Sequence, residues 1–176
     1  LDDWFDGTFA PSVEFARGCP FSCGFCYAGQ SYFSPVVTFS NDRIKEDLTY
    51  IAKKMVDYPN IPLSICDSNF GMAKKDEDIA GIIIAIQDKY NWPNVFNVTT
   101  GKANYDRILH ISTLLNNKLN VTCSVQSLHP ETLDIIKRKN LPLDQYIEVQ
   151  KEIRKRKMPS IAELIVPLPL ETKASF

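Results

Sequence analysis

Residues 12–26 read "SVEFARGCPFSCGFC", a strand-like run that leads directly into a loop with three cysteines. The loop cysteines are Cys19, Cys23 and Cys26, so their spacing is C-x3-C-x2-C. The 176-residue chain has five cysteines and starts without a basic, apolar leader. An odd number of cysteines without such a leader favours reduced thiols over a disulfide scaffold. We therefore expect a cytoplasmic protein that uses the three clustered thiols as ligands.

Apolar, β-branched runs alternate along the chain with segments of helical periodicity. Strands are expected over residues 12–18, 61–68, 94–100, 120–127 and 160–169, and helices over 41–58, 74–90, 104–119, 129–139 and 143–157. Asn41 or Asp42 is the expected cap of the first helix. Alternation of this kind is typical of parallel strands with right-handed crossovers, whose ligands gather at the carboxyl ends of the strands. We expect one α/β domain with a parallel sheet of about five strand–helix units.

Composition narrows the classes of partner. A net charge of -1 and a hydrophobic fraction of 44% fit a soluble globular protein, and no apolar run reaches membrane-spanning length. The basic run at 151–157 is interpreted as a solvated helix face, so neither a nucleic acid nor a membrane is expected as a partner. Cys66 and Cys123 lie in apolar strand-like runs, and we expect both in the core.

The cysteine triplet has three physical interpretations. A structural zinc site needs four ligands, and its fourth ligand would have to come from Cys66, Cys123, His110 or His129. An electron carrier of the ferredoxin type needs four cysteines for each 4Fe–4S cluster. In the third interpretation, three thiolates hold three irons and leave the fourth iron open to a ligand. A zinc-stabilised or non-catalytic iron–sulfur binding module remains the alternative to an enzyme.

Four segments carry a resemblance to a known family. "CPFSCGFC" resembles the C-x3-C-x-aromatic-C signature of radical S-adenosylmethionine (SAM) enzymes, with Phe25 as the aromatic. "DSNF" (67–70), "SVQSLHPETLDIIKRKN" (124–140) and "LIVPLPLET" (164–172) follow in the order of the branch whose members often carry a cobalamin-binding domain. Pro167 and Leu170 depart from that branch, which commonly has glycines there.

The resemblance implies a fold and its limits. The family core has six strand–helix units, and this chain covers five of them. We therefore expect residues 1–176 to form a partial, incomplete TIM-type barrel. The sixth unit and any N-terminal cobalamin domain would lie outside the chain.

The resemblance also implies cofactors and site residues. Cys19, Cys23 and Cys26 would hold a 4Fe–4S cluster whose open iron binds SAM, and one electron would cleave SAM to methionine and a 5′-deoxyadenosyl radical. Contacts to SAM are expected from Phe25, Asp67, Ser68, Asn69, Lys102, Ser124, Gln126 and Glu163. No side chain is assigned a catalytic role.

The position of each residue suggests its contact. Asp67, Ser68 and Asn69 stand where the family binds the methionine amino group, and Lys102 can pair with the methionine carboxylate. Ser124 and Gln126 would reach the ribose hydroxyls or the carboxylate of SAM, and Glu163 would bind a SAM hydroxyl. Phe25 would shield the cluster or contact adenine.

The expected function is therefore that of a radical SAM enzyme. The substrate, a small molecule or a peptide, is not identified by the sequence. The electron donor is expected to be of the flavodoxin or ferredoxin type. Use of cobalamin through a domain outside the chain, with methyl transfer as the outcome, is left open.

Overall fold

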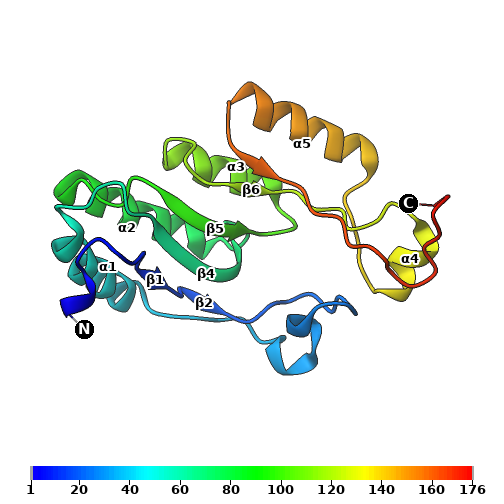
Figure 1. The fold of residues 1–176 in the computed structure, drawn as a ribbon, viewed down its shortest axis with the longest axis horizontal. Helices are drawn as coiled ribbons and strands as arrows, with labels where there is room; N and C mark the ends of the chain where they lie inside the picture. The colour runs from blue at the N-terminus through cyan, green and yellow to red at the C-terminus, as the bar shows by residue number, and fades with distance from the viewer. Residues whose placement is uncertain (1, 176) are drawn as a thin grey trace.

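The computed structural model describes residues 2–175 and has the predicted α/β architecture (Figure 1). Its main sheet is parallel, with strand order β1-β4-β5, and comprises β1 (Ser12–Val13), β4 (Leu63–Phe70) and β5 (Phe96–Thr100). A second parallel pair joins β6 (Val121–Thr122) to β7 (Ser160–Ile161). β2 (Ala16–Arg17) pairs antiparallel with β3 (Val37–Thr38).

The helices follow the strands as expected. Their bounds are α1 (Asn41–Met55), α2 (Lys75–Tyr90), α3 (Tyr105–Leu114), α4 (Pro130–Ile135) and α5 (Leu143–Lys155), with short 3-10 turns at Asp2–Trp4, Tyr27–Gly29 and Ser31–Phe33. The predicted cap of α1 was wrong, because Ser40 holds the extended N-cap position and its Oγ accepts a hydrogen bond from Arg43 N at 3.3 Å.

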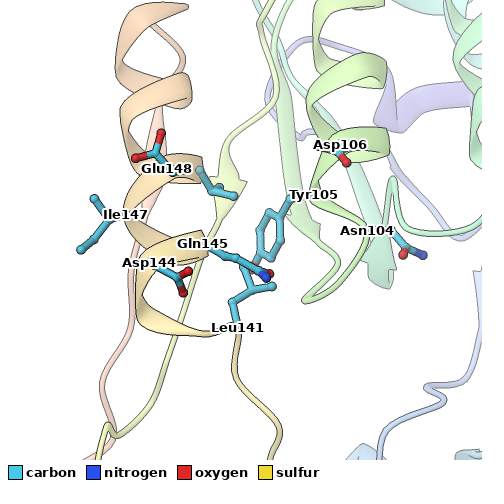
Figure 2. Close-up of a pocket in the computed structure, with 9 residues that line it drawn as sticks. Asn104, Tyr105, Asp106, Leu141, Asp144, Gln145, Ile147 and Glu148 are labelled. Carbon is cyan, nitrogen blue, oxygen red and sulfur yellow. The ribbon is translucent and has the colours of Figure 1, made fainter.

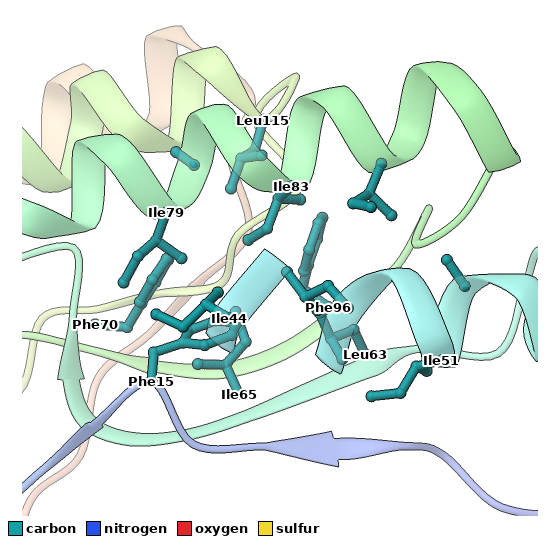
Figure 3. Packing of buried hydrophobic residues seen from close by; sticks show 14 of the residues in the cluster. Phe15, Ile44, Ile51, Leu63, Ile65, Phe70, Ile79, Ile83, Phe96 and Leu115 are labelled. Atoms are coloured by element: carbon teal, nitrogen blue, oxygen red, sulfur yellow. The ribbon is translucent and has the colours of Figure 1, made fainter. Parts of the chain in front are cut away.

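The main core lies on one face of the β1-β4-β5 sheet. Leu63, Ile65 and Phe70 of β4 pack there against apolar side chains of α1 and α2 (Figure 3). From Leu63 to Ser68 the side chains of β4 alternate in direction, so Ser64, Cys66 and Ser68 lie on the other face, where Cys66 and Ser68 are exposed. A register shift between Ile65 and Phe70 interrupts the alternation, and Phe70 packs in the core. The prediction of a buried Cys66 was therefore wrong, whereas Cys123 is buried as predicted.

The sheet is not continuous from β1 to β7. Between β5 and β6, the Thr100 Oγ1 atom accepts a hydrogen bond from Thr122 N at 2.7 Å, and the two strands are not backbone-paired. The expected strand at 12–18 is also interrupted. Its first part, β1, pairs with β4, whereas its second part, β2, pairs with β3. An open arrangement of parallel strands with helices on the outside is consistent with a partial TIM-type barrel.

Candidate functional site

The cysteine loop is fastened to the fold at several points. Cys19 N donates to the Phe33 carbonyl at 2.8 Å, and Gly24 N donates to the Ile136 carbonyl, just after α4, also at 2.8 Å. Gly29 lies so close to the loop that an added Cβ would meet the Cys23 carbonyl oxygen at 2.2 Å. Cys19 and Cys23 are buried and Cys26 is half-buried. The loop is therefore held compactly, with its thiols largely shielded from solvent.

Gly18 gives the loop its entry angle. Its φ is +110°, and an added Cβ would meet the Pro35 carbonyl oxygen at 2.4 Å. Both the left-handed backbone and the close approach require glycine at this position.

Asp67 fastens the strand that leads into the loop. Its Oδ1 accepts a hydrogen bond from Phe15 N at 2.7 Å, and its Oδ2 accepts one from Ala16 N at 2.9 Å. Burial raises the pKa of this carboxyl to about 7, and the two backbone N–H groups only partly oppose that shift. Asp67 thus ties β4 to the backbone just ahead of Cys19.

Asn69 reaches the loop itself. Its Nδ2 donates to Cys19 Sγ at 3.2 Å. Its Oδ1 is buried and has no hydrogen-bond partner within residues 2–175. The sequence did not predict that this amide would bond a cysteine thiol through its N–H end and leave its oxygen without a partner.

A second group of predicted residues meets where β6 and β7 end. Ser124 Oγ donates to Glu163 Oε2 at 3.2 Å and accepts from Glu163 N at 3.0 Å. Gln126 N donates to the Glu163 carbonyl at 3.3 Å. Gln126 is buried with φ +65°, and its Oε1 has no partner in the part of the chain that the structure describes. A strained, buried residue with an unused acceptor is typical of a functional site.

The other predicted residues are less constrained. Phe25 and Lys102 are half-buried and Ser68 is exposed. Within residues 2–175, no side-chain hydrogen bond joins any of the three to Asn69 or to Gln126.

Sequence reasoning missed Arg138 and Asn140, which order the end of β6. The buried Arg138 guanidinium donates to the Ser124 carbonyl and to Asn140 Oδ1, the latter at 2.9 Å. Asn140 Nδ2 donates to the carbonyls of Val125 and Ser127 at 2.8 Å each. Both residues lie in the quoted segment 124–140, but only the fold shows that their side chains return to the strand.

Leu170 is one of the two positions at which the sequence departs from the glycines common in the branch. It has φ +64° and is largely exposed. This is the left-handed conformation that glycine prefers. The backbone therefore keeps a glycine-like conformation at a position where the branch commonly has glycine.

The cysteine loop supplies the thiol donors that a 4Fe–4S cluster requires. Among residues 2–175, no three His, Cys, Asp or Glu side chains converge closely enough to hold one ion. The thiolates of a 4Fe–4S cluster bind different irons, so they surround a cube rather than a point. Three thiols on one loop, with the unpartnered Asn69 Oδ1 beside Cys19, suit such a cluster and an additional ligand.

A separate pocket of about 670 Å³ lies between α3 and α5 (Figure 2). Tyr105 and Gln145 point into it from the two helices, and Asp106, Asp144 and Glu148 are among the residues that line it. None of the predicted site residues contributes to this pocket. It is therefore not part of the candidate site.

Comparison with known proteins decides the family. The family model described as "Radical SAM superfamily" matches residues 13–176. This chain belongs to the radical SAM superfamily. The match begins within β1 and includes the cysteine loop. It also includes the polar residues of β4 and those near the ends of β6 and β7. A zinc-stabilised or non-catalytic module is accordingly not favoured.

The radical SAM chain is similar to two curated methyltransferases. It is 32% identical over 166 residues to the "Cobalamin-dependent radical SAM methyltransferase TokK" of Streptomyces tokunonensis, covering 93% of this chain and 24% of that protein. It is also 32% identical, with the same coverage, to the "2-(S-pantetheinyl)-carbapenam-3-carboxylate methyltransferase" of Streptantibioticus cattleyicolor. The chain thus spans about a quarter of the length of these relatives.

Solved structures support the fold of the radical SAM chain. The methyltransferase TsrM from Kitasatospora setae, solved with tryptophan and a SAM analogue, aligns with a TM-score of 0.75 at 12% identity and covers 98% of this chain and 33% of its own. OxsB, a cobalamin-dependent SAM radical enzyme solved with aqua-cobalamin and SAM, aligns with a TM-score of 0.65 at 15% identity, over 89% of this chain and 24% of its own. At these identities the likeness shows the shared fold.

Proposed function

We propose that this chain is the catalytic core of a radical SAM enzyme that binds a 4Fe–4S cluster through Cys19, Cys23 and Cys26. The observation that carries the proposal is the position of the loop, held between β4 and the end of α4 in a chain whose family model covers the same residues. When bound, the cluster supplies the single electron that cleaves SAM into methionine and a 5′-deoxyadenosyl radical.

The polar residues around the loop would bind and orient SAM. Asn69 Oδ1 and Gln126 Oε1 are buried acceptors without partners among residues 2–175, so they suit the N–H groups of the methionine moiety or the ribose hydroxyls. The Glu163 carboxylate, oriented by Ser124, is a further acceptor for hydroxyl groups. Lys102 would pair with the methionine carboxylate.

The remaining predicted residues would complete this site. Phe25, between two of the cysteines, would exclude water from the cluster. Asp67 and Ser68 lie in the last part of β4, and we place them near the amino group of the methionine moiety of SAM. There Asp67 would act mainly through the backbone that it already holds.

We propose methyl transfer with cobalamin as the overall reaction. The support is the similarity over 93% of this chain to a cobalamin-dependent radical SAM methyltransferase. The cobalamin would be held by a part of the protein outside these residues.

The setting of the enzyme is proposed on similar grounds. A flavodoxin- or ferredoxin-type donor would supply the electron that the family chemistry requires. Five thiols without disulfides suit the cytoplasm. Within residues 2–175, no helix has the length and apolar character that crossing a membrane requires.

Anaerobic reconstitution of the intact protein with iron and sulfide tests the proposal. We expect the charge-transfer absorption of a thiolate-ligated cluster, and 5′-deoxyadenosine from SAM once a reductant is added. Omission of the reductant is the control, because no electron is then available. A protein that binds one zinc tightly and releases no 5′-deoxyadenosine contradicts the proposal.

A further inference from the structure

The amide of Asn69 lies against a thiol that the proposed function makes a cluster ligand. Asn69 and Cys19 are 50 residues apart in the chain, yet the Nδ2–Sγ distance is 3.2 Å. Asn69 is half-buried and Cys19 is buried, so bulk water competes little for this hydrogen bond. The contact is therefore a defined feature of the fold rather than a chance approach of two exposed side chains.

Both partners are held in place by their backbones. The Asn69 carbonyl accepts a hydrogen bond from Met72 N at 3.4 Å, and Gly101 N donates to the adjacent Phe70 carbonyl at 3.0 Å. On the other side of the contact, Cys19 N donates to the Phe33 carbonyl. The backbone at both ends of the contact is therefore fixed, which sets where the two side chains start.

The chemistry of the thiolate determines which end of the amide it meets. A cluster-bound thiolate can only accept hydrogen bonds, so the amide must present Nδ2–H to Cys19 and keep Oδ1 on the other side. Hydrogen bonds to cluster sulfurs are among the factors that set the reduction potential. An N–H donor stabilises the more negative, reduced state, and its loss makes reduction harder.

We propose that Asn69 is a positioning residue that raises the reduction potential of the cluster through its Nδ2–H hydrogen bond to Cys19. This inference rests on the proposed function, because it requires a cluster on Cys19. It adds a role to Asn69 that differs from SAM binding: the N–H end acts on the cluster, whereas the Oδ1 end stays available to a ligand.

The test is a redox titration of the intact, anaerobically reconstituted protein without SAM, followed by electron paramagnetic resonance of the reduced cluster. Asn69→Leu keeps the approximate size of the side chain and removes the donor. We expect its reduction equilibrium to shift about tenfold toward the oxidised cluster, which is about 59 mV for a one-electron couple.

Three further variants make the result specific. Asn69→Asp also lacks the N–H and should lower the potential at least as much as the leucine variant, because it adds an acidic group. Asn69→Gln retains an amide N–H and should stay closer to wild type. Asn97→Leu removes an amide from the same sheet, opposite Ser64 at the other end of β4, and should leave the potential unchanged.

The outcomes separate this inference from the proposed function. A wild-type potential in Asn69→Leu overturns the inference, as does a decrease confined to Asn69→Asp, which would show a charge effect alone. If the leucine variant fails to assemble the cluster, the comparison is between the glutamine and aspartate variants. A reduction potential of Asn69→Gln that is no higher than that of Asn69→Asp then overturns the inference. Failure of the proposed function would appear instead in the wild-type protein, as absence of a cluster or of 5′-deoxyadenosine.

Discussion

Asp67→Asn should change how the stability of the protein depends on pH. Only 4% of Asp67 is exposed, and its burial raises the pKa of the carboxyl from 3.8 to about 7. Since the folded-state value lies above the unfolded one, the folded protein binds this proton more tightly. The stabilising contribution is complete below about pH 3.8 and is lost progressively as the pH rises to about 7.

The expected size of the effect follows from the shift. Each unit of pKa difference corresponds to about 1.36 kcal/mol, so the rise from 3.8 to about 7 corresponds to about 4 kcal/mol of unfolding free energy. Asparagine has nearly the same shape but does not titrate. It also replaces one acceptor with an NH2 group facing the backbone N–H groups of Phe15 and Ala16, which adds a constant cost at every pH.

Urea-induced unfolding, followed by circular dichroism at pH values from 4 to 8, measures the effect. We expect the free energy of unfolding of wild type, minus that of Asp67→Asn, to fall by about 4 kcal/mol across this range. Asp88→Asn, which alters an exposed carboxylate on α2, is the matched control and should follow the wild-type profile. Parallel pH profiles for wild type and Asp67→Asn would refute the reasoning.

Two pairs of substitutions, each a change in the cysteine loop with a control elsewhere in the chain, test the loop. Cys23→Ala should abolish the iron and sulfide content of the reconstituted protein, whereas Cys123→Ala, which alters a buried core thiol, should retain it; equal loss in both contradicts the ligand assignment. Gly29→Ala places a Cβ at 2.2 Å from the Cys23 carbonyl oxygen, so the loop must shift, at a cost of about 1–3 kcal/mol, and cluster content should fall. Gly81→Ala in α2 meets nothing within 4 Å and should stabilise the protein by about 0.5–1 kcal/mol in thermal unfolding, without loss of iron.

The class of fold could be predicted from the sequence because its signals are local. Helical periodicity and short β-branched runs alternate along the chain, and each can be recognised within one segment. The helices at α1, α2 and α5 accordingly begin close to where they were expected. Strand ends were less accurate, since β6 and β7 keep only two paired residues each of the longer runs that were predicted. Pairing depends on the neighbouring strand, which local periodicity does not describe.

The candidate site divides in the same way. The spacing of Cys19, Cys23 and Cys26 pointed to a cluster without knowledge of the fold, because all three ligands lie on one loop. The polar residues in the last part of β4 and after β6 were predicted as a set, from their expected place at the carboxyl ends of strands. Their individual contacts were not, and those remain predictions wherever SAM is concerned.

By itself, the sequence determined the α/β class, the cysteine triplet and the family resemblance, because each of these depends on short local segments and on their order along the chain. Only the tertiary structure decided that Cys66 is exposed, that Asp67 holds the backbone of Phe15 and Ala16, and that Asn69 meets Cys19. These features depend on which strands are neighbours and which sheet face the helices cover. Contacts across about 50 residues form only when β4 is placed beside the strand that enters the cysteine loop.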